Sequence, residues 1–261
     1  MNISFTVNLQ RFVPWLGYHH VLMLFCLGAI VLWSITLAGC SSYSSMTNIY
    51  ILAVEYANGT APKTATNVSS MLREARGIAQ LQSRVGYFGQ CVRKGGIAWV
   101  CGGDAQTLVS EFGNDDPLSM LDILGQFQKD VLFSGFIFMA IVLVFFAVVT
   151  LATFPGWHQE TDDTGEEIDV KPFPSKVAIK FCSLTSGFAT VFCIVSALWQ
   201  HTAAVSAATM IEGLSYGNLK ASVGPGAMAL SWLGVALLCV VNLGIVVMWA
   251  SMAILDQLTE D

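Results

Sequence analysis

Four long stretches of the chain contain no Asp, Glu, Lys or Arg, namely residues 18–39, 131–154, 181–199 and 221–255, and they constrain the fold more than any other feature. Each approaches or exceeds the roughly 20 residues that an α-helix needs to cross a hydrocarbon core of about 30 Å. Their apolar residues are continuous rather than alternating, which favours helices over strands. The sequence therefore predicts a mainly α membrane protein with a bundle of four transmembrane helices, at residues 18–39, 130–154, 178–201 and 227–255.

Composition supports the same class of protein. The chain is 54% hydrophobic and only 11% charged, whereas a typical soluble domain has about 25% charged residues. The surplus apolar surface must therefore face lipid, and the bilayer is the first expected partner. The predicted spans leave an amino-terminal lead (1–17), a large loop (40–129), an inner loop (155–177), a short loop (202–226) and a tail (256–261).

The basic residues of the short segments predict the orientation. Arg11 and three lysines in residues 155–180, Lys171, Lys176 and Lys180, lie on one side, against Lys220 alone in the last loop. Short loops rich in Lys and Arg stay in the cytosol. We therefore expect a multi-pass protein with both termini cytosolic and with the loops 40–129 and 202–226 outside.

The large loop contains the expected folded part outside the membrane. Residues 47–56, 81–92 and 97–101 have strand-like composition, and Arg93–Gly96 is typical of a hairpin turn. Residues 71–79 predict a short helix, and a second helix is expected from Pro117 directly into the next span. Seven basic and seven acidic residues make the loop neutral. Without a basic patch, nucleic-acid binding is not expected.

Two cysteines and two sequons indicate that this loop lies in an oxidising compartment. Cys91 and Cys101 are spaced for a disulfide that closes a short hairpin, and such bonds persist outside the cytosol. Asn58-Gly59-Thr60 and Asn67-Val68-Ser69 are acceptor sequences for glycosylation, so Asn58 and Asn67 are predicted to be modified. These signals agree with the charge bias.

Residues 37–40 allow another interpretation of the amino terminus. Leu-Ala-Gly-Cys resembles a bacterial lipoprotein box, in which Cys40 would be lipidated after cleavage. Three further spans and the length of the first apolar run favour an uncleaved helix instead. Acylation of Cys40 stays open. The inner loop is acidic from residue 160 and flanked by proline, so we expect it to be flexible.

Residues with catalytic chemistry are scarce. The sequence has no nucleophile with a paired base, no His-Cys metal spacing and no Gly-rich phosphate loop, so neither an enzyme nor a cofactor is expected. Acidic residues of the large loop are candidates for weak calcium contacts, because Ca²⁺ prefers several oxygen ligands. They match no known calcium loop, and an ordinary solvated surface is the favoured interpretation. The candidates are Asp104, Glu111, Asp115 and Asp116.

A motif in the large loop resembles a known family. Residues Gly86, Tyr87, Phe88, Gly89 and Cys91, followed by Cys101, together with four spans, are similar to the claudin-like superfamily. The form found here most resembles the fungal branch of low-affinity calcium-influx and mating-fusion regulators, and less closely the fungal cortical-patch proteins associated with eisosomes. Animal claudins place a Trp earlier in this loop, and residues 40–85 contain none.

The resemblance implies a small extracellular antiparallel sheet in the first outer loop, anchored by the motif. It further implies a plasma-membrane accessory protein that promotes calcium influx and cell–cell fusion during mating. Its partners would be calcium channel subunits beside it or the same protein on a neighbouring cell, with homo-oligomers as an option. A structural organiser of cortical patches and a pore formed by several copies stay as alternatives. Spans without charged residues give a single copy no evident cation path.

Overall fold

The computed structural model describes residues 17–41, 46–57, 67–155, 158–161, 167–170 and 174–260. In this part of the chain four helices are long and apolar enough to cross a membrane, which confirms the predicted class. They are α1 (Tyr18–Ala38), α5 (Gly135–Ala152), α6 (Lys176–Leu214) and α7 (Pro225–Glu260). The sequence-predicted lead, residues 1–17, lies outside the described residues except for Gly17.

The chain divides into two compact units. The first, here the bundle unit, comprises Met1–Ile30, Ala140–Val191 and Ala236–Asp261. The second, here the sheet unit, comprises Val31–Met139 and Phe192–Val235. Each helix that could span a membrane contributes residues to both units, whereas the larger of the two sheets belongs to the sheet unit alone.

Hydrogen bonds across helices and small-residue contacts hold the bundle unit together. Asn242 on α7 donates to Thr190 Oγ1 at 2.6 Å and accepts from Ser186 Oγ at 2.8 Å, both on α6. Asn242 therefore has a structural role, since polar groups in lipid bond across helices. Gly244 lies directly against Leu22 and Tyr18 of α1.

The inner loop contains a short hairpin, where the sequence predicted a flexible acidic linker. Strands β5 (His158–Thr161) and β6 (Glu167–Val170) pair antiparallel, with Glu160 opposite Ile168. Ile168 and Val170 alternate with Glu167 and Asp169, which is the two-residue period of a strand. Acidic composition concealed this alternation. Residues 162–166 and 171–173 lie outside the described residues.

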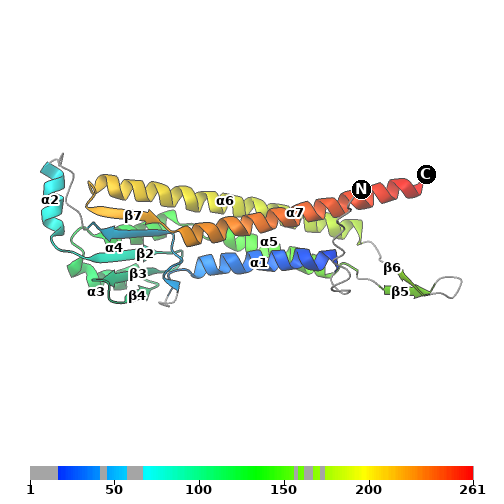
Figure 1. Ribbon diagram of the computed structural model, residues 1–261, viewed down its shortest axis with the longest axis horizontal. Helices are drawn as coiled ribbons and strands as arrows, with labels where there is room; N and C mark the ends of the chain where they lie inside the picture. Colours follow the sequence, from blue (N-terminus) through cyan, green and yellow to red (C-terminus); the bar gives the residue numbers. More distant parts are fainter. Residues whose placement is uncertain are drawn as a thin grey trace, which may run out of the picture. The chain divides into compact units, whose positions relative to one another are not determined.

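An antiparallel five-stranded sheet forms the centre of the sheet unit, with its strands side by side in the order β4-β3-β2-β1-β7 (Figure 1). The large loop supplies β1 (Leu52–Tyr56), β2 (Leu81–Val85), β3 (Gln90–Lys94) and β4 (Trp99–Gly102). The fifth strand, β7 (Leu219–Val223), comes from the connection between α6 and α7 and pairs with β1. The prediction of a sheet made by the first outer loop alone was therefore incomplete.

The two faces of this sheet differ in polarity. One face packs against α3 (Ala105–Phe112) and α4 (Met120–Gln126) and is apolar, with Leu52, Val54 and Val92 buried in it. The other face is polar and only half-buried. Its side chains come from alternate positions of the strands and include Glu55, Gln82, Arg84, Arg93 and Trp99. This set is called the polar face below.

Several predicted boundaries are corrected by the structure. The predicted strand 81–92 is two strands, because Gly86–Gly89 forms a turn between β2 and β3. The helix expected from Pro117 into the second span is interrupted: α4 passes into a π-helical turn (Phe127–Val131), and α5 begins only at Gly135. Residues 133–135 read Phe-Ser-Gly, and Ser and Gly favour helix ends over helix interiors.

Helix α6 continues to Leu214, although the sequence predicted its end at residue 201. The extension is rich in alanine, the strongest helix former, so it needs no lipid environment to stay helical. The remaining elements of the sheet unit are α2 (Asn67–Arg76) and a 3₁₀ turn (Gly113–Asp115).

Candidate functional site

The turn between β2 and β3 is built from the motif glycines and packs on the end of α1. Gly86 N donates to Gly89 O at 2.9 Å. A Cβ atom built on Gly86 would lie 2.2 Å from Gly39 O, and one on Gly89 would lie 1.9 Å from Cys40 O. The backbone of Gly39 and Cys40 therefore excludes a side chain at either glycine. The motif glycines fix the sheet to the first helix.

Tyr87 connects the same turn to α6 and α7. Its side chain is buried, and its hydroxyl donates to Gln200 Oε1 at 3.1 Å. Ser231 Oγ on α7 donates to the same oxygen at 2.9 Å. Gln200 is 1% exposed, so this amide is enclosed by protein. Phe88 is exposed and lies 6.0 Å from the ring of Phe138 on α5.

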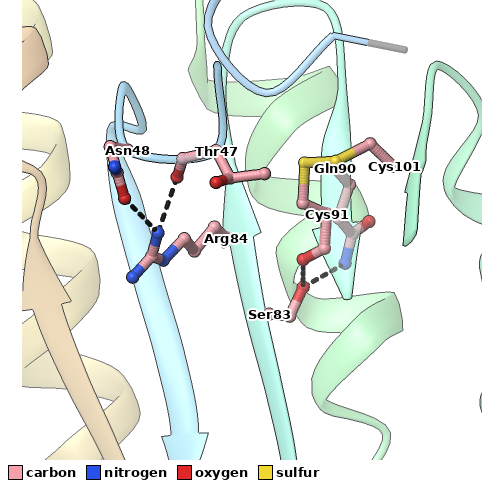
Figure 2. Close-up of a disulfide and its surroundings, with 7 residues drawn as sticks. All are labelled: Thr47, Asn48, Ser83, Arg84, Gln90, Cys91 and Cys101. Carbon is pink, nitrogen blue, oxygen red and sulfur yellow. Dashed lines mark hydrogen bonds between the residues drawn. A yellow bond between two sulfur atoms is a disulfide. The ribbon is translucent and has the colours of Figure 1, made fainter. Parts of the chain in front are cut away.

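The predicted disulfide between Cys91 and Cys101 is present, with an S–S distance of 2.07 Å. The two cysteines are directly opposite each other on β3 and β4, whose connecting turn uses positive φ angles at Gly95 and Gly96. That geometry is typical of a tight hairpin. Figure 2 shows the bond beside Arg84, with Ser83 and Gln90 hydrogen-bonded to each other at 3.0 Å.

Arg84 is the centre of a stacked group on the polar face. Its guanidinium lies 4.7 Å from the ring centroid of Tyr50 and 4.3 Å from that of Trp99. It also donates to Thr47 O at 2.7 Å and to Asn48 Oδ1 at 3.1 Å (Figure 2). These contacts hold Arg84 in one position, which leaves Trp99 as a fixed and half-exposed aromatic surface.

A second row of side chains continues the polar face. Arg93 lies 4.8 Å from the Trp99 ring and also donates to Gln82 Oε1 at 3.1 Å through Nε. Gln82 Nε2 in turn donates to Glu55 Oε2 at 2.6 Å. A shallow hollow of about 240 Å³ opens over these rows. The sequence analysis singled out none of these residues, although polar residues at every second strand position were the available signal.

The acidic calcium candidates are not gathered into one site. Asp104 caps α3 by accepting from Gln106 N, and Glu111 is an exposed residue of that helix. Asp115 forms an ion pair with Lys94 at 2.6 Å. Across the described ranges, no three His, Cys, Asp or Glu residues lie close enough to hold a metal ion.

Asp116 has a structural role that accounts for its burial. Its carboxylate accepts from Tyr56 Oη at 2.5 Å, Met120 N at 3.0 Å and Leu121 N at 2.7 Å. Burial, together with the hydrogen bond to this carboxylate, raises the pKa of Tyr56. With three donors already bound, Asp116 stabilises the start of α4 and ties it to β1, and few of its lone pairs stay available for a cation.

The two sequons are placed differently by the structure. Asn67 is the exposed first residue of α2, where a glycan would meet solvent. Asn58 lies outside the described residues. Modification of either residue stays a prediction.

Comparison with known proteins gives the family. No curated protein matches the chain. A family model does match, over residues 65–251, a range that includes α2, the motif, the disulfide and most of the last three helices. Its description, Ca²⁺ regulator and membrane fusion protein, agrees with the resemblance of the motif. The chain belongs to the family of the Ca²⁺ regulator and membrane fusion protein Fig1.

Proposed function

We propose that this protein is an accessory protein of the plasma membrane that promotes low-affinity calcium influx and cell–cell membrane fusion during fungal mating. The family provides calcium regulation and membrane fusion. The polar face supports the more specific claim that the protein acts by contact. Its charged and aromatic side chains are half-exposed and are fixed in position by their mutual contacts. Side chains of this kind contribute much of the binding energy in protein interfaces.

Contact explains regulation better than conduction or calcium binding does. The four apolar stretches carry no Asp, Glu, Lys or Arg, so one copy has no charged path at membrane depth. The acidic residues of the large loop cap helices, pair with a lysine or stand alone. We therefore assign the conduction of calcium to a partner protein, which this protein regulates by contact. The polar face is the proposed binding surface for that partner.

The proposed partner is a calcium channel subunit in the same membrane or another copy on the neighbouring cell. Both require the sheet unit to be extracellular and both termini to be cytosolic, as the charge bias and the disulfide favour. Glycans at Asn58 and Asn67 belong to the same proposal. The glycan at Asn67 would lie away from Trp99, since Asn67 begins a helix that is not part of the polar face.

Trp99→Ala tests this proposal. The change removes the ring that Arg84 and Arg93 both contact while leaving the disulfide and the apolar face in place. Loss of an interface Trp weakens binding by about tenfold or more. We expect calcium uptake and mating fusion to fall in cells whose surface abundance and disulfide content match the wild type.

Lys129→Ala is the matched control, because Lys129 is exposed in the sheet unit but lies outside the polar face. Uptake and fusion should stay normal in cells that carry it. Normal uptake and fusion with Trp99→Ala, at wild-type surface abundance, would show that the polar face is not the working surface.

A further inference from the structure

A groove of about 620 Å³ runs along the part of α6 that extends beyond its predicted span. One wall is α6 itself, where Ala203, Ala207, Met210 and Leu214 follow one another at helical spacing. The other wall is α4 with the π-helical turn, and residues of α2 and β7 complete the lining. All of these residues belong to the sheet unit.

The groove is apolar, and its large side chains are partly uncovered. Met210 is 66% exposed, Leu214 is 78% exposed and Ile123, on the opposite wall, is 40% exposed. Side chains of this kind gain free energy when they leave water. The volume of the groove lies in the usual range of small-molecule sites, so it suits an apolar ligand.

One end of the groove lies next to the membrane surface. A span that starts after Lys180 has used its roughly 20 residues by Gln200, so Ala203 lies just beyond it. Trp199 Nε1 donates to the backbone oxygen of Val131 at 2.9 Å, and Val131 lines the groove. Tryptophan is typical of the headgroup level of a bilayer. The lipid of the adjacent leaflet is therefore the nearest apolar molecule.

The length of the groove matches one hydrocarbon chain. Ala203 and Leu214 are eleven residues apart, which corresponds to about 16 Å along a helix. An acyl chain in one leaflet spans half of the hydrocarbon core, or about 15 Å. The chain segment that precedes α2, residues 58–66, contains no Leu, Ile, Val, Met or aromatic residue. It therefore has no large apolar side chain to offer to the groove.

A carboxylate at the membrane end favours one kind of headgroup. Asp130 is exposed, lines the groove beside Val131 and forms no ion pair in the described part of the chain. Its neighbour Lys129 does not line the groove. A carboxylate attracts a cationic choline group and repels an anionic headgroup. Asp130 also belongs to the π-helical turn, a rare conformation that is frequent at functional sites.

From these observations we propose that the groove binds one acyl chain of a choline phospholipid from the adjacent leaflet. The headgroup stays at the membrane surface beside Asp130, and the end of the chain reaches Leu214. The chain exchanges lipid neighbours for apolar side chains, while Met210, Leu214 and Ile123 leave water. The inference goes beyond the proposed function and does not depend on the polar face, since no residue of that face lines the groove.

Photoaffinity labelling of the full-length protein in nanodiscs tests the proposal. The nanodiscs consist of phosphatidylcholine with a trace of phosphatidylcholine that carries a diazirine at the end of one acyl chain. Labelled residues are located by peptide mass spectrometry. In an ordinary bilayer the end of the chain lies at the midplane and labels the middle of the spans. A chain in the groove labels residues 210–214 of α6 as well, and we expect this labelling in the wild type.

Two variants should remove the labelling of residues 210–214. Ala207→Trp fills the groove, and labelling there should fall about tenfold, since the chain loses contacts equal to two or more methylenes. Ile123→Asp places a charge on the opposite wall at an exposed position, so the same loss is expected without a change in the core. Thr209→Trp is the matched control, because Thr209 is exposed on α6 and does not line the groove. It should label like the wild type, and thermal midpoints show that each variant is folded.

The headgroup is tested with the same photoactivatable chain on phosphatidylglycerol. This anionic lipid should label residues 210–214 about twofold to fivefold less than phosphatidylcholine does, and Asp130→Asn should remove the difference. A difference that persists in Asp130→Asn would overturn the choice of headgroup. Labelling confined to the spans would overturn the proposal, because no partner protein is present to occupy the groove. Equal labelling of residues 210–214 in the wild type, Ala207→Trp and Ile123→Asp would overturn it as well, whereas the effect of Trp99→Ala concerns the polar face alone.

Discussion

Gly89→Ala should release the β2–β3 turn from the end of α1. The new Cβ would lie 1.9 Å from Cys40 O, while atoms in real structures stay beyond 3.0 Å, so two backbone segments must separate by more than 1 Å. Overpacking of this kind costs about 1–3 kcal/mol. Displacement of the turn also weakens the buried Tyr87–Gln200 hydrogen bond, which contributes about 0.5–1.5 kcal/mol. We expect a loss of about 1.5–4.5 kcal/mol in the free energy of unfolding.

Labelling of Cys40 measures this release directly. Cys40 is fully buried beneath the turn, and burial raises the pKa of its thiol to about 12. A maleimide therefore modifies it slowly in the wild type, because only the thiolate reacts. In Gly89→Ala the labelling rate at Cys40, followed by peptide mass spectrometry, should rise several-fold, and the thermal midpoint in detergent should fall.

Gly113→Ala is the matched control for this prediction. Gly113 belongs to the same unit, has a helical φ of −60°, and a Cβ there would meet Val109 at an ordinary 3.8 Å. It should label and melt like the wild type. Wild-type labelling of Cys40 in Gly89→Ala, or equal effects of the two alanine variants, would refute the close-approach argument.

Two further predictions concern the disulfide and the buried amide. The paired change Cys91→Ser and Cys101→Ser should lower stability by about 2–4 kcal/mol, seen as a lower thermal midpoint, since a cross-link chiefly restricts the unfolded chain; an unchanged midpoint would contradict this. Gln200→Leu should cost about 1–3 kcal/mol by leaving two buried hydroxyl donors without an acceptor. Thr202→Val, which changes an exposed residue on the same helix, should melt like the wild type, and a similar loss in both variants would argue against the special role of Gln200.

The features that local sequence determines were predicted well. Four uncharged stretches gave four helices, because the length and polarity of one segment decide whether it can cross a bilayer. The Cys91–Cys101 hairpin could be predicted equally well, since its two strands and its turn lie within a dozen residues or so. In both cases the information sits in one contiguous piece of chain.

The features that depend on distant contacts were missed. β7 pairs with β1, which is distant from it in the sequence. The local sequence of residues 219–223 does not indicate which strand it pairs with. The partners of Gln200 were missed as well, because Tyr87 and Ser231 are distant from it in the sequence. The separate contacts of the acidic residues were also missed, since Asp116 caps α4 and Asp115 pairs with Lys94.

The pairing of β7 with β1 has a consequence for biosynthesis. β1 lies near residue 52 and is made early, but its neighbour on one side begins only at Leu219. Until that part of the chain has been synthesised, one edge of β1 exposes unpaired amide and carbonyl groups, which attract other strands. A chain truncated before β7 would retain this open edge, so the edge of β1 distinguishes an unfinished molecule from a complete one.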